Sequence, residues 1–139
     1  MSDPELRLRV IPAIDQVAAE AWDACANPAL EEAKLKSQEC QYNPFISHDF
    51  LNALEASASA TARTGWQPQH LLAERPDGTV LGAVPCYLKS HSRGEYVFDR
   101  GWAEAYERAG GDYYPKLQVS VPFTPATVSY THLTLPTKA

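Results

Sequence analysis

A run of six residues between two predicted strands concentrates side chains that could do chemistry. Lys89-Ser90-His91-Ser92-Arg93-Gly94 offers an ammonium, an imidazole, a guanidinium, two hydroxyls and flexible backbone. Donors of these kinds can hold a carboxylate or a phosphate. The same residues are also typical of a solvated hairpin turn. Spacing alone therefore leaves both an anion site and a plain turn open.

His91 and Glu95 form a candidate pair for proton transfer, four residues apart. A carboxylate can orient an imidazole and stabilise its charged form, and an imidazole titrates near neutral pH. Either residue could act as the base and the other as its orienting partner. The catalytic candidates of the sequence are these two residues.

Four aromatic residues gather near Lys116, namely Trp102, Tyr106, Tyr113 and Tyr114. Aromatic rings can line a groove in which a sugar or peptide stacks, while their polar tips fix its orientation. The rival interpretation is core packing, because Trp102 and Tyr106 have the i, i+4 spacing of one helix face. Adjacent residues of a strand point in opposite directions, so at most one of the two adjacent tyrosines need be buried.

The remaining histidines and the cysteines show no metal or disulfide pattern. His48 and His70 have no partner at metal-ligand spacing, so we interpret both as structural and expect no metal. The three cysteines, Cys25, Cys40 and Cys86, are widely spaced and include no CxxC pair, which is typical of a reducing compartment. Cys86 is expected to be a buried strand residue without a reactive thiolate.

The composition excludes several classes of partner. The chain has 139 residues, 45% of them hydrophobic, and a formal net charge of -5. An acidic chain lacks the basic field that nucleic acid or an anionic membrane requires. No stretch approaches a membrane span of about 18 apolar residues, and no signal peptide opens the sequence. We therefore expect a cytoplasmic protein that binds neither nucleic acid nor membrane.

Hydrophobic periodicity predicts one mixed α/β domain of the α+β kind, with a mixed or antiparallel sheet flanked by helices. The expected elements are a strand at 6–11, helices at 16–25 and 29–41, a helix after Ser47, a hairpin of 70–74 and 79–88, a strand at 96–98, a helix after Asp99 and a strand at 117–121. The clearest of them is the hairpin, whose strands flank a Pro-Asp-Gly turn.

Alternation and capping residues set the expected ends of these elements. Leu6, Leu8 and Val10 alternate with arginines, which indicates a half-buried first strand. Asp15 is a suitable N-cap for the first helix. Gly110 and the glycine after it are expected to end the last helix.

The last twelve residues, VSYTHLTLPTKA, differ from the rest of the chain. They are rich in threonine and uncharged until Lys138. They also correspond to the translation of a transposase adapter end, GTC TCT TAT ACA CAT CTG ACG CTG CCG ACG. We therefore predict that residues 128–139 are a non-native, disordered tail and that the native domain is readable over 1–127.

Three stretches resemble the FemAB-like family of predicted N-acyltransferases, of the peptidoglycan biosynthesis or recognition type. They are NPFISHDFLNALEAS at 43–57, TGWQPQHLLAE at 64–74 and GAVPCYLKSHSRGEYVFDRGWAEAYERAGGDYYPKLQVSVPFTP at 82–125. The third is the longest and the most specific. The segment 27–41 shows no pattern of this family and is interpreted as a local insertion.

The resemblance implies part of a GNAT-like fold that transfers an acyl or aminoacyl group to an amine of a small molecule, peptide or cell-wall precursor. Acyl-CoA is implied for the full-length parent. The Gly-rich loop that would bind its pyrophosphate at a helix N-terminus has no counterpart here, so we expect an N-terminal fragment that is inactive alone and holds no cofactor. Within such an enzyme the substrate-binding candidates are Lys89, Arg93, Trp102, Tyr106, Tyr113, Tyr114 and Lys116, with Arg93 and Lys116 as anion holders. The alternative is a small non-enzymatic α/β module that recognises a cell-wall-like or peptide ligand.

Overall fold

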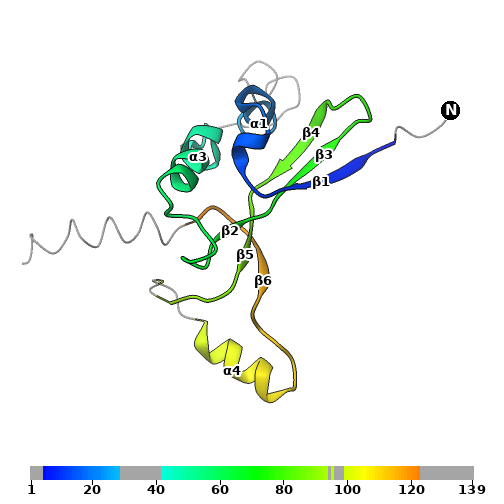
Figure 1. The fold of residues 1–139 in the computed structure, drawn as a ribbon. Helices are drawn as coiled ribbons and strands as arrows, with labels where there is room; N and C mark the ends of the chain where they lie inside the picture. The colour runs from blue at the N-terminus through cyan, green and yellow to red at the C-terminus, as the bar shows by residue number, and fades with distance from the viewer. Residues whose placement is uncertain (1–4, 29–41, 94, 96–98, 123–139) are drawn as a thin grey trace, which may run out of the picture.

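The computed structural model describes residues 5–28, 42–93, 95 and 99–122. Within these ranges the fold is α+β, with helices beside two small antiparallel sheets, as predicted (Figure 1). The helix expected at 29–41, the strand expected at 96–98 and the tail expected at 128–139 lie outside the described residues.

The first sheet has the strand order β1-β3-β4. β1 (Arg7–Ile11) pairs with β3 (His70–Glu74), and β3 pairs with β4 (Val80–Val84) across the predicted Pro-Asp-Gly turn. Gly78 in that turn has a φ of +88°, a conformation that glycine adopts without strain. The predicted hairpin is confirmed.

The second sheet has the strand order β2-β5-β6. It includes the second half of the segment that was predicted as one long hairpin strand. The expected strand at 79–88 is divided at Pro85 into β4 and β5 (Cys86–Lys89). Proline has no N–H group for the strand ladder, so the chain changes sheets at this residue. β5 then pairs with both β2 (Gln67–Pro68) and β6 (Lys116–Val119).

The exposure of β1 differs from the expected half-buried pattern. Leu8 and Val10 are 78% and 51% exposed, and of the five strand residues only Ile11 is buried. Helix α1 (Ala19–Ala26) packs against β4 rather than β1, so β1 is an uncovered edge strand for most of its length (Figure 1). The strand itself is confirmed, but the half-buried pattern predicted from Leu6, Leu8 and Val10 is wrong.

The first helix starts later than predicted. A 3-10 turn, η1 (Ile14–Gln16), contains Asp15, and Val17 after it has extended backbone, so α1 begins only after Ala18. Asp15 therefore does not cap the helix. The buried residues of this region are Ile14, Val17 and Trp22, and they form the main core with Ile11, Leu51 and Leu72.

Helix α3 (His48–Ala56) packs against both η1 and α1 in the N-terminal half of the chain. Its predicted start after Ser47 is confirmed. Ser47 caps the helix, because its hydroxyl accepts a hydrogen bond from the Phe50 N–H at 3.2 Å. His48 is buried and its Nε2 lies 3.0 Å from the Ile14 carbonyl and 3.1 Å from the Val17 carbonyl. This contact supports the structural role expected for His48.

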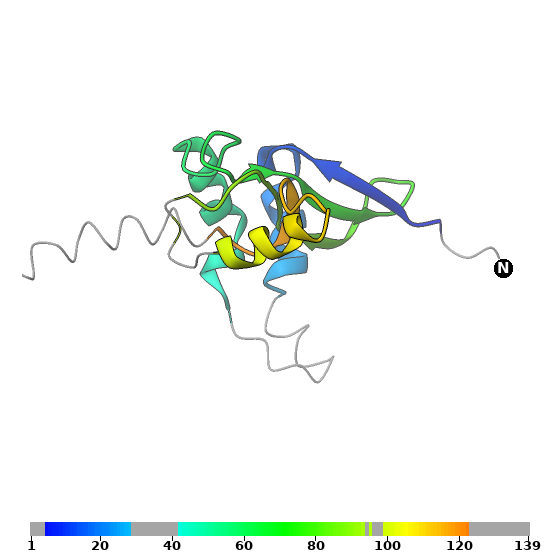
Figure 2. The ribbon, with the colours of Figure 1, turned by 90° about the horizontal axis from the view of Figure 1, so that it is seen from below.

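Helix α4 (Arg100–Arg108) lies at the end of the molecule away from α1 and α3 (Figure 1). It is in the foreground when the molecule is seen from below (Figure 2). The helix ends as predicted at Gly110, whose φ is +89°. Trp102 is 76% exposed and Tyr106 55% exposed, so the core-packing interpretation of these two aromatics is wrong.

Candidate functional site

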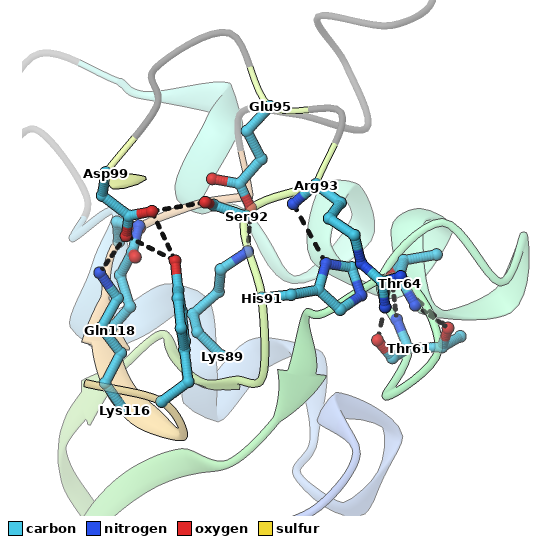
Figure 3. A network of polar contacts seen from close by, with 12 residues as sticks. Thr61, Thr64, Lys89, His91, Ser92, Arg93, Glu95, Asp99, Lys116 and Gln118 are labelled. Atoms are coloured by element: carbon cyan, nitrogen blue, oxygen red, sulfur yellow. Dashed lines mark hydrogen bonds and ion pairs between the residues drawn. The ribbon is translucent and has the colours of Figure 1, made fainter. Parts of the chain in front are cut away.

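Most of the predicted site residues lie where β5, β6 and the start of α4 meet. The pairing of β5 with β6 places Lys89 opposite Lys116. Asp99, the residue before α4, reaches toward the start of β6 from the other side (Figure 3). Two separate polar clusters form here, one around Lys89 and one around Asp99.

Lys89 lies inside the molecule, with 1% of its side chain exposed. Its Nζ donates a hydrogen bond to the Glu95 carboxylate, which is also buried, and sits 3.8 Å from the ring centroid of Trp66. Burial lowers the pKa of the Lys89 ammonium, although Glu95 opposes this effect. Lys89 is therefore occupied by a carboxylate and an aromatic face of its own chain.

Glu95 thus pairs with Lys89 and not with His91. The His91 ring lies on the opposite side of the loop, where Nε2 is 3.2 Å from the Arg63 carbonyl oxygen and Nδ1 accepts a hydrogen bond from the Arg93 N–H at 3.2 Å. Figure 3 shows this separation, with the imidazole beside Thr61 and Thr64. The structure does not bring the two catalytic candidates together.

Asp99 is the centre of the second cluster. Its carboxylate accepts hydrogen bonds from the Tyr114 hydroxyl at 2.6 Å, from Lys116 Nζ at 2.7 Å and from the Ser92 hydroxyl. The Lys116 ammonium also donates to the Tyr113 hydroxyl at 2.9 Å. One carboxylate therefore joins the predicted loop to two predicted substrate-binding residues.

The charges of this cluster stabilise one another. Burial favours the neutral form of Asp99, but the hydrogen bonds from Lys116, Ser92 and Tyr114 outweigh it and hold the pKa of the carboxyl below its ordinary range. Burial and the Asp99 charge raise the pKa of the Tyr114 phenol to about 12. The hydrogen bonds to Asp99 and Tyr113 outweigh burial and raise the pKa of the Lys116 ammonium.

Three of the four predicted aromatics lie together. The ring centroids of Tyr106 and Tyr113 are 6.2 Å apart and those of Tyr113 and Tyr114 are 5.0 Å apart, both at edge-to-face angles. Lys116 Nζ lies 4.3 Å from the centroid of Tyr113. Trp102 stands apart on α4, and none of the described rings contacts it. We call Tyr106, Tyr113, Tyr114 and Lys116 the tyrosine face.

Sequence reasoning missed two residues that organise this site. Asp99 was expected only to precede a helix, where an aspartate is a common N-cap. Its side chain makes no capping hydrogen bond and instead contacts residues next to and on β6. Trp66, which covers the Lys89 ammonium, was not considered at all. The sequence does contain one signal for this role of Asp99. Tyr114 and Lys116, two residues apart, are both hydrogen-bond donors that could share one carboxylate acceptor.

Other site interpretations are settled by burial. Cys86 is 1% exposed on β5, as predicted, and burial raises the pKa of its thiol. Arg93 is exposed at the molecular surface.

In the ranges that the structure describes, no three His, Cys, Asp or Glu residues are grouped so as to hold a metal ion, and no helix is long and apolar enough to cross a membrane.

Comparison with known proteins gives one match. No curated protein and no solved structure matches the chain. The profile of the FemAB-like family, described as peptidoglycan biosynthesis/recognition, matches residues 13–134, a range that contains the whole site and extends into the segment 128–139. The chain, matched over most of its length, belongs to the FemAB-like peptidoglycan biosynthesis/recognition family.

Proposed function

We propose that this chain binds the acceptor substrate of an N-acyltransferase, an amine-bearing cell-wall precursor that receives an acyl or aminoacyl group. The family match supports a role connected with peptidoglycan. The observation that carries the acceptor role is the tyrosine face, where aromatic rings and a lysine ammonium lie together at the surface. Stacking surfaces with fixed polar tips suit a substrate made of sugars and peptide.

The described residues do not fit acyl-CoA as its binding site. A pyrophosphate binds where free N–H groups open a helix. At α1 the Glu20 carboxylate lies in the first turn, and α4 begins directly after the Asp99 carboxylate, so a negative charge at each of these helix starts would repel an anion. At α3 the Ser47 hydroxyl already occupies the Phe50 N–H. We therefore place the donor site outside these residues, in a longer parent protein, and expect this chain alone to be inactive.

The predicted pair of proton-transfer residues contributes little to this proposal. Both ring nitrogens of His91 are engaged by backbone groups, and Glu95 neutralises the buried Lys89. Neither side chain is free to take a proton from an amine in this arrangement. The chain's contribution is therefore recognition of the acceptor through the tyrosine face.

Binding of a synthetic cell-wall stem peptide with a free lysine amine, measured by intrinsic fluorescence, tests the proposal. We expect saturable binding that Tyr113→Ala weakens about tenfold, a loss of about 1.4 kcal/mol. Leu8→Ser, on the distant and exposed β1, is the matched control and should leave binding unchanged. No binding, or equal binding by both variants, would contradict the acceptor role.

A stand-alone recognition module is the second candidate, and the exposed apolar side chains distinguish the two. Trp102, Leu117 and Val119 are 76%, 65% and 65% exposed, which favours a part of a larger enzyme whose other half covers them. Urea unfolding with a hydrophobic dye tests this. A sharp transition without dye binding supports the module instead.

The source DNA offers a second, independent check. Sequencing across codon 127 with primers outside the adapter-like string should show a frame that continues into a second half with a Gly-rich, helix-opening loop. A gene that reads VSYTHLTLPTKA and then stops would remove the tail prediction and favour the recognition module.

A further inference from the structure

A cleft separate from the tyrosine face lies between η1 and the C-terminal half of α3. Its volume is about 350 Å³, enough for a small organic group. The lining residues are Pro12, Ala13, Asp15, Asn52, Glu55, Ala56, Ala60, Thr61 and Pro68. The walls are mostly small and apolar, and the charged groups among them are two carboxylates.

Glu55 is the most enclosed charged group of the cleft, with 12% of its side chain exposed. Its Oε1 accepts a hydrogen bond from the Ile14 N–H at 2.9 Å, and its Oε2 lies 2.9 Å from Nε2 of His70. These two contacts hold the carboxylate in one orientation. Each carboxylate oxygen can accept a second hydrogen bond, so both retain capacity toward the cleft.

The imidazole of His70 does not neutralise this carboxylate. Nδ1 of His70 accepts a hydrogen bond from the Cys86 backbone N–H at 3.3 Å, so Nδ1 carries no proton and the ring is the neutral tautomer with its proton on Nε2. The pair of Glu55 and His70 therefore keeps a net charge of −1. His70 itself is fully buried and its ring packs edge-to-face against Trp22 and Tyr87.

The surroundings of the pair supply no compensating cation. Neither lysine nor arginine lines the cleft, and Asp15 adds a second negative charge at its mouth. The Tyr87 hydroxyl is buried beside His70 and makes no hydrogen bond with the described residues. Burial, and then the charge of Glu55, raise the pKa of this phenol. A buried carboxylate that neutral donors orient is most stable when a cation joins it.

We propose that this cleft binds a primary ammonium group, with Glu55 as its main anionic partner and Asp15 as a second one. The apolar walls formed by Pro12, Ala56 and Pro68 would contact the alkyl stem that carries the ammonium. A lysine-like side chain has this combination of a charged tip and an apolar stem. Its identification as the acceptor amine rests on the proposed acyl transfer, whereas ammonium binding rests on the cleft alone.

Titration of the complete chain with Nα-acetyl-lysine methylamide, followed by NMR amide shifts, tests the site. The norleucine analogue, which has the same stem without the ammonium, is the matched ligand control. We expect saturable shifts at Asn52, Glu55 and Thr61 with the lysine compound, and binding at least tenfold weaker with the norleucine compound. Equal binding of the two compounds would overturn the ammonium site.

Three variants locate the charge that matters. Glu55→Gln should weaken lysine binding about tenfold, and Asp15→Asn, at an exposed position without effect on the core, should weaken it several-fold. Glu104→Gln on α4 removes the same charge far from the cleft and should change nothing. Unchanged binding in both cleft variants would show that Glu55 serves only to join Ile14 to His70.

The outcome is independent of the test on the tyrosine face. Lysine-compound shifts confined to Tyr113 and Lys116 would contradict the cleft and leave the proposed acceptor role intact. Shifts confined to the cleft, together with stem-peptide binding that Tyr113→Ala leaves unchanged, would support the ammonium site and remove the proposed role of the tyrosine face.

Discussion

Replacing Asp99 with asparagine should destabilise the fold, because this carboxylate accepts hydrogen bonds from Ser92, Tyr114 and Lys116. A hydrogen bond to a charged group contributes about 1.5–3 kcal/mol. Asparagine keeps one acceptor oxygen, and the freed donors gain water because the cluster is partly exposed. We therefore expect a loss of about 2–3 kcal/mol in the free energy of unfolding for the whole cluster.

Urea denaturation followed by far-UV circular dichroism measures this loss. Asp112→Asn, the same substitution at an exposed position beyond α4, is the matched control and should shift the unfolding free energy by less than about 0.5 kcal/mol. The double variant with Lys116→Met should show a coupling energy of about 1–2 kcal/mol. Additive effects would refute the assigned contact between Asp99 and Lys116.

The stabilisation by the Asp99 carboxylate should also depend on pH in a defined direction. The pKa of Asp99 is lower in the folded chain than its ordinary value, so its contribution is fully present above about pH 4. It is lost as the pH falls through the folded-state pKa. The stability difference between wild type and Asp99→Asn should therefore shrink below pH 4. A difference that stays constant down to pH 2 would contradict the charge-based explanation.

Two further predictions concern the neighbouring loop. Glu95→Gln should lower the unfolding free energy by about 3 kcal/mol, because it leaves the Lys89 ammonium buried without its counter-charge, whereas the double change to Lys89→Met and Glu95→Leu should lie closer to wild type. Urea melts that place the single variant within about 0.5 kcal/mol of wild type would contradict this. Gly65→Ala should lower the melting temperature more than Gly78→Ala: both glycines have φ above +80°, but only a Cβ at residue 65 would lie 2.8 Å from the His91 carbonyl oxygen. Equal melting temperatures of the two variants would show that the His91 contact is unimportant.

Local signals predicted the elements that depend on neighbours in sequence. The hairpin has a glycine turn between alternating strands, and α3 has Ser47 as its cap, so both could be located correctly. The start of α1 was misplaced because Asp15 belongs to a 3-10 turn and Val17, the next residue after that turn, has extended backbone. Ile14 and Val17 are core residues here, and the spacing of apolar residues alone does not distinguish this turn from the first turn of a helix.

The sequence predicted several residues of the site, but not which of them contact one another. Lys89, Tyr114 and Lys116 were named as substrate-binding candidates, and the structure places Lys89 and Lys116 opposite each other on β5 and β6. Their partners depend on burial and on tertiary approach, which short-range spacing does not encode. For this reason Glu95 was predicted as the partner of His91. In the structure it pairs with Lys89, because a buried ammonium is strongly destabilising without a negative counter-charge.

The contacts of Asp99 also join the two ends of the segment that contains α4, since Asp99 and Lys116 are seventeen residues apart in sequence. The length-dependent part of the chain-entropy cost of closing a flexible loop of this size is about 2.5 kcal/mol, and the side-chain contacts at the junction help to offset it. The helix in between contributes no residue to the buried core. Apart from Tyr106, which belongs to the tyrosine face, the outward residues of this helix can therefore be exchanged by design without disturbing the buried core.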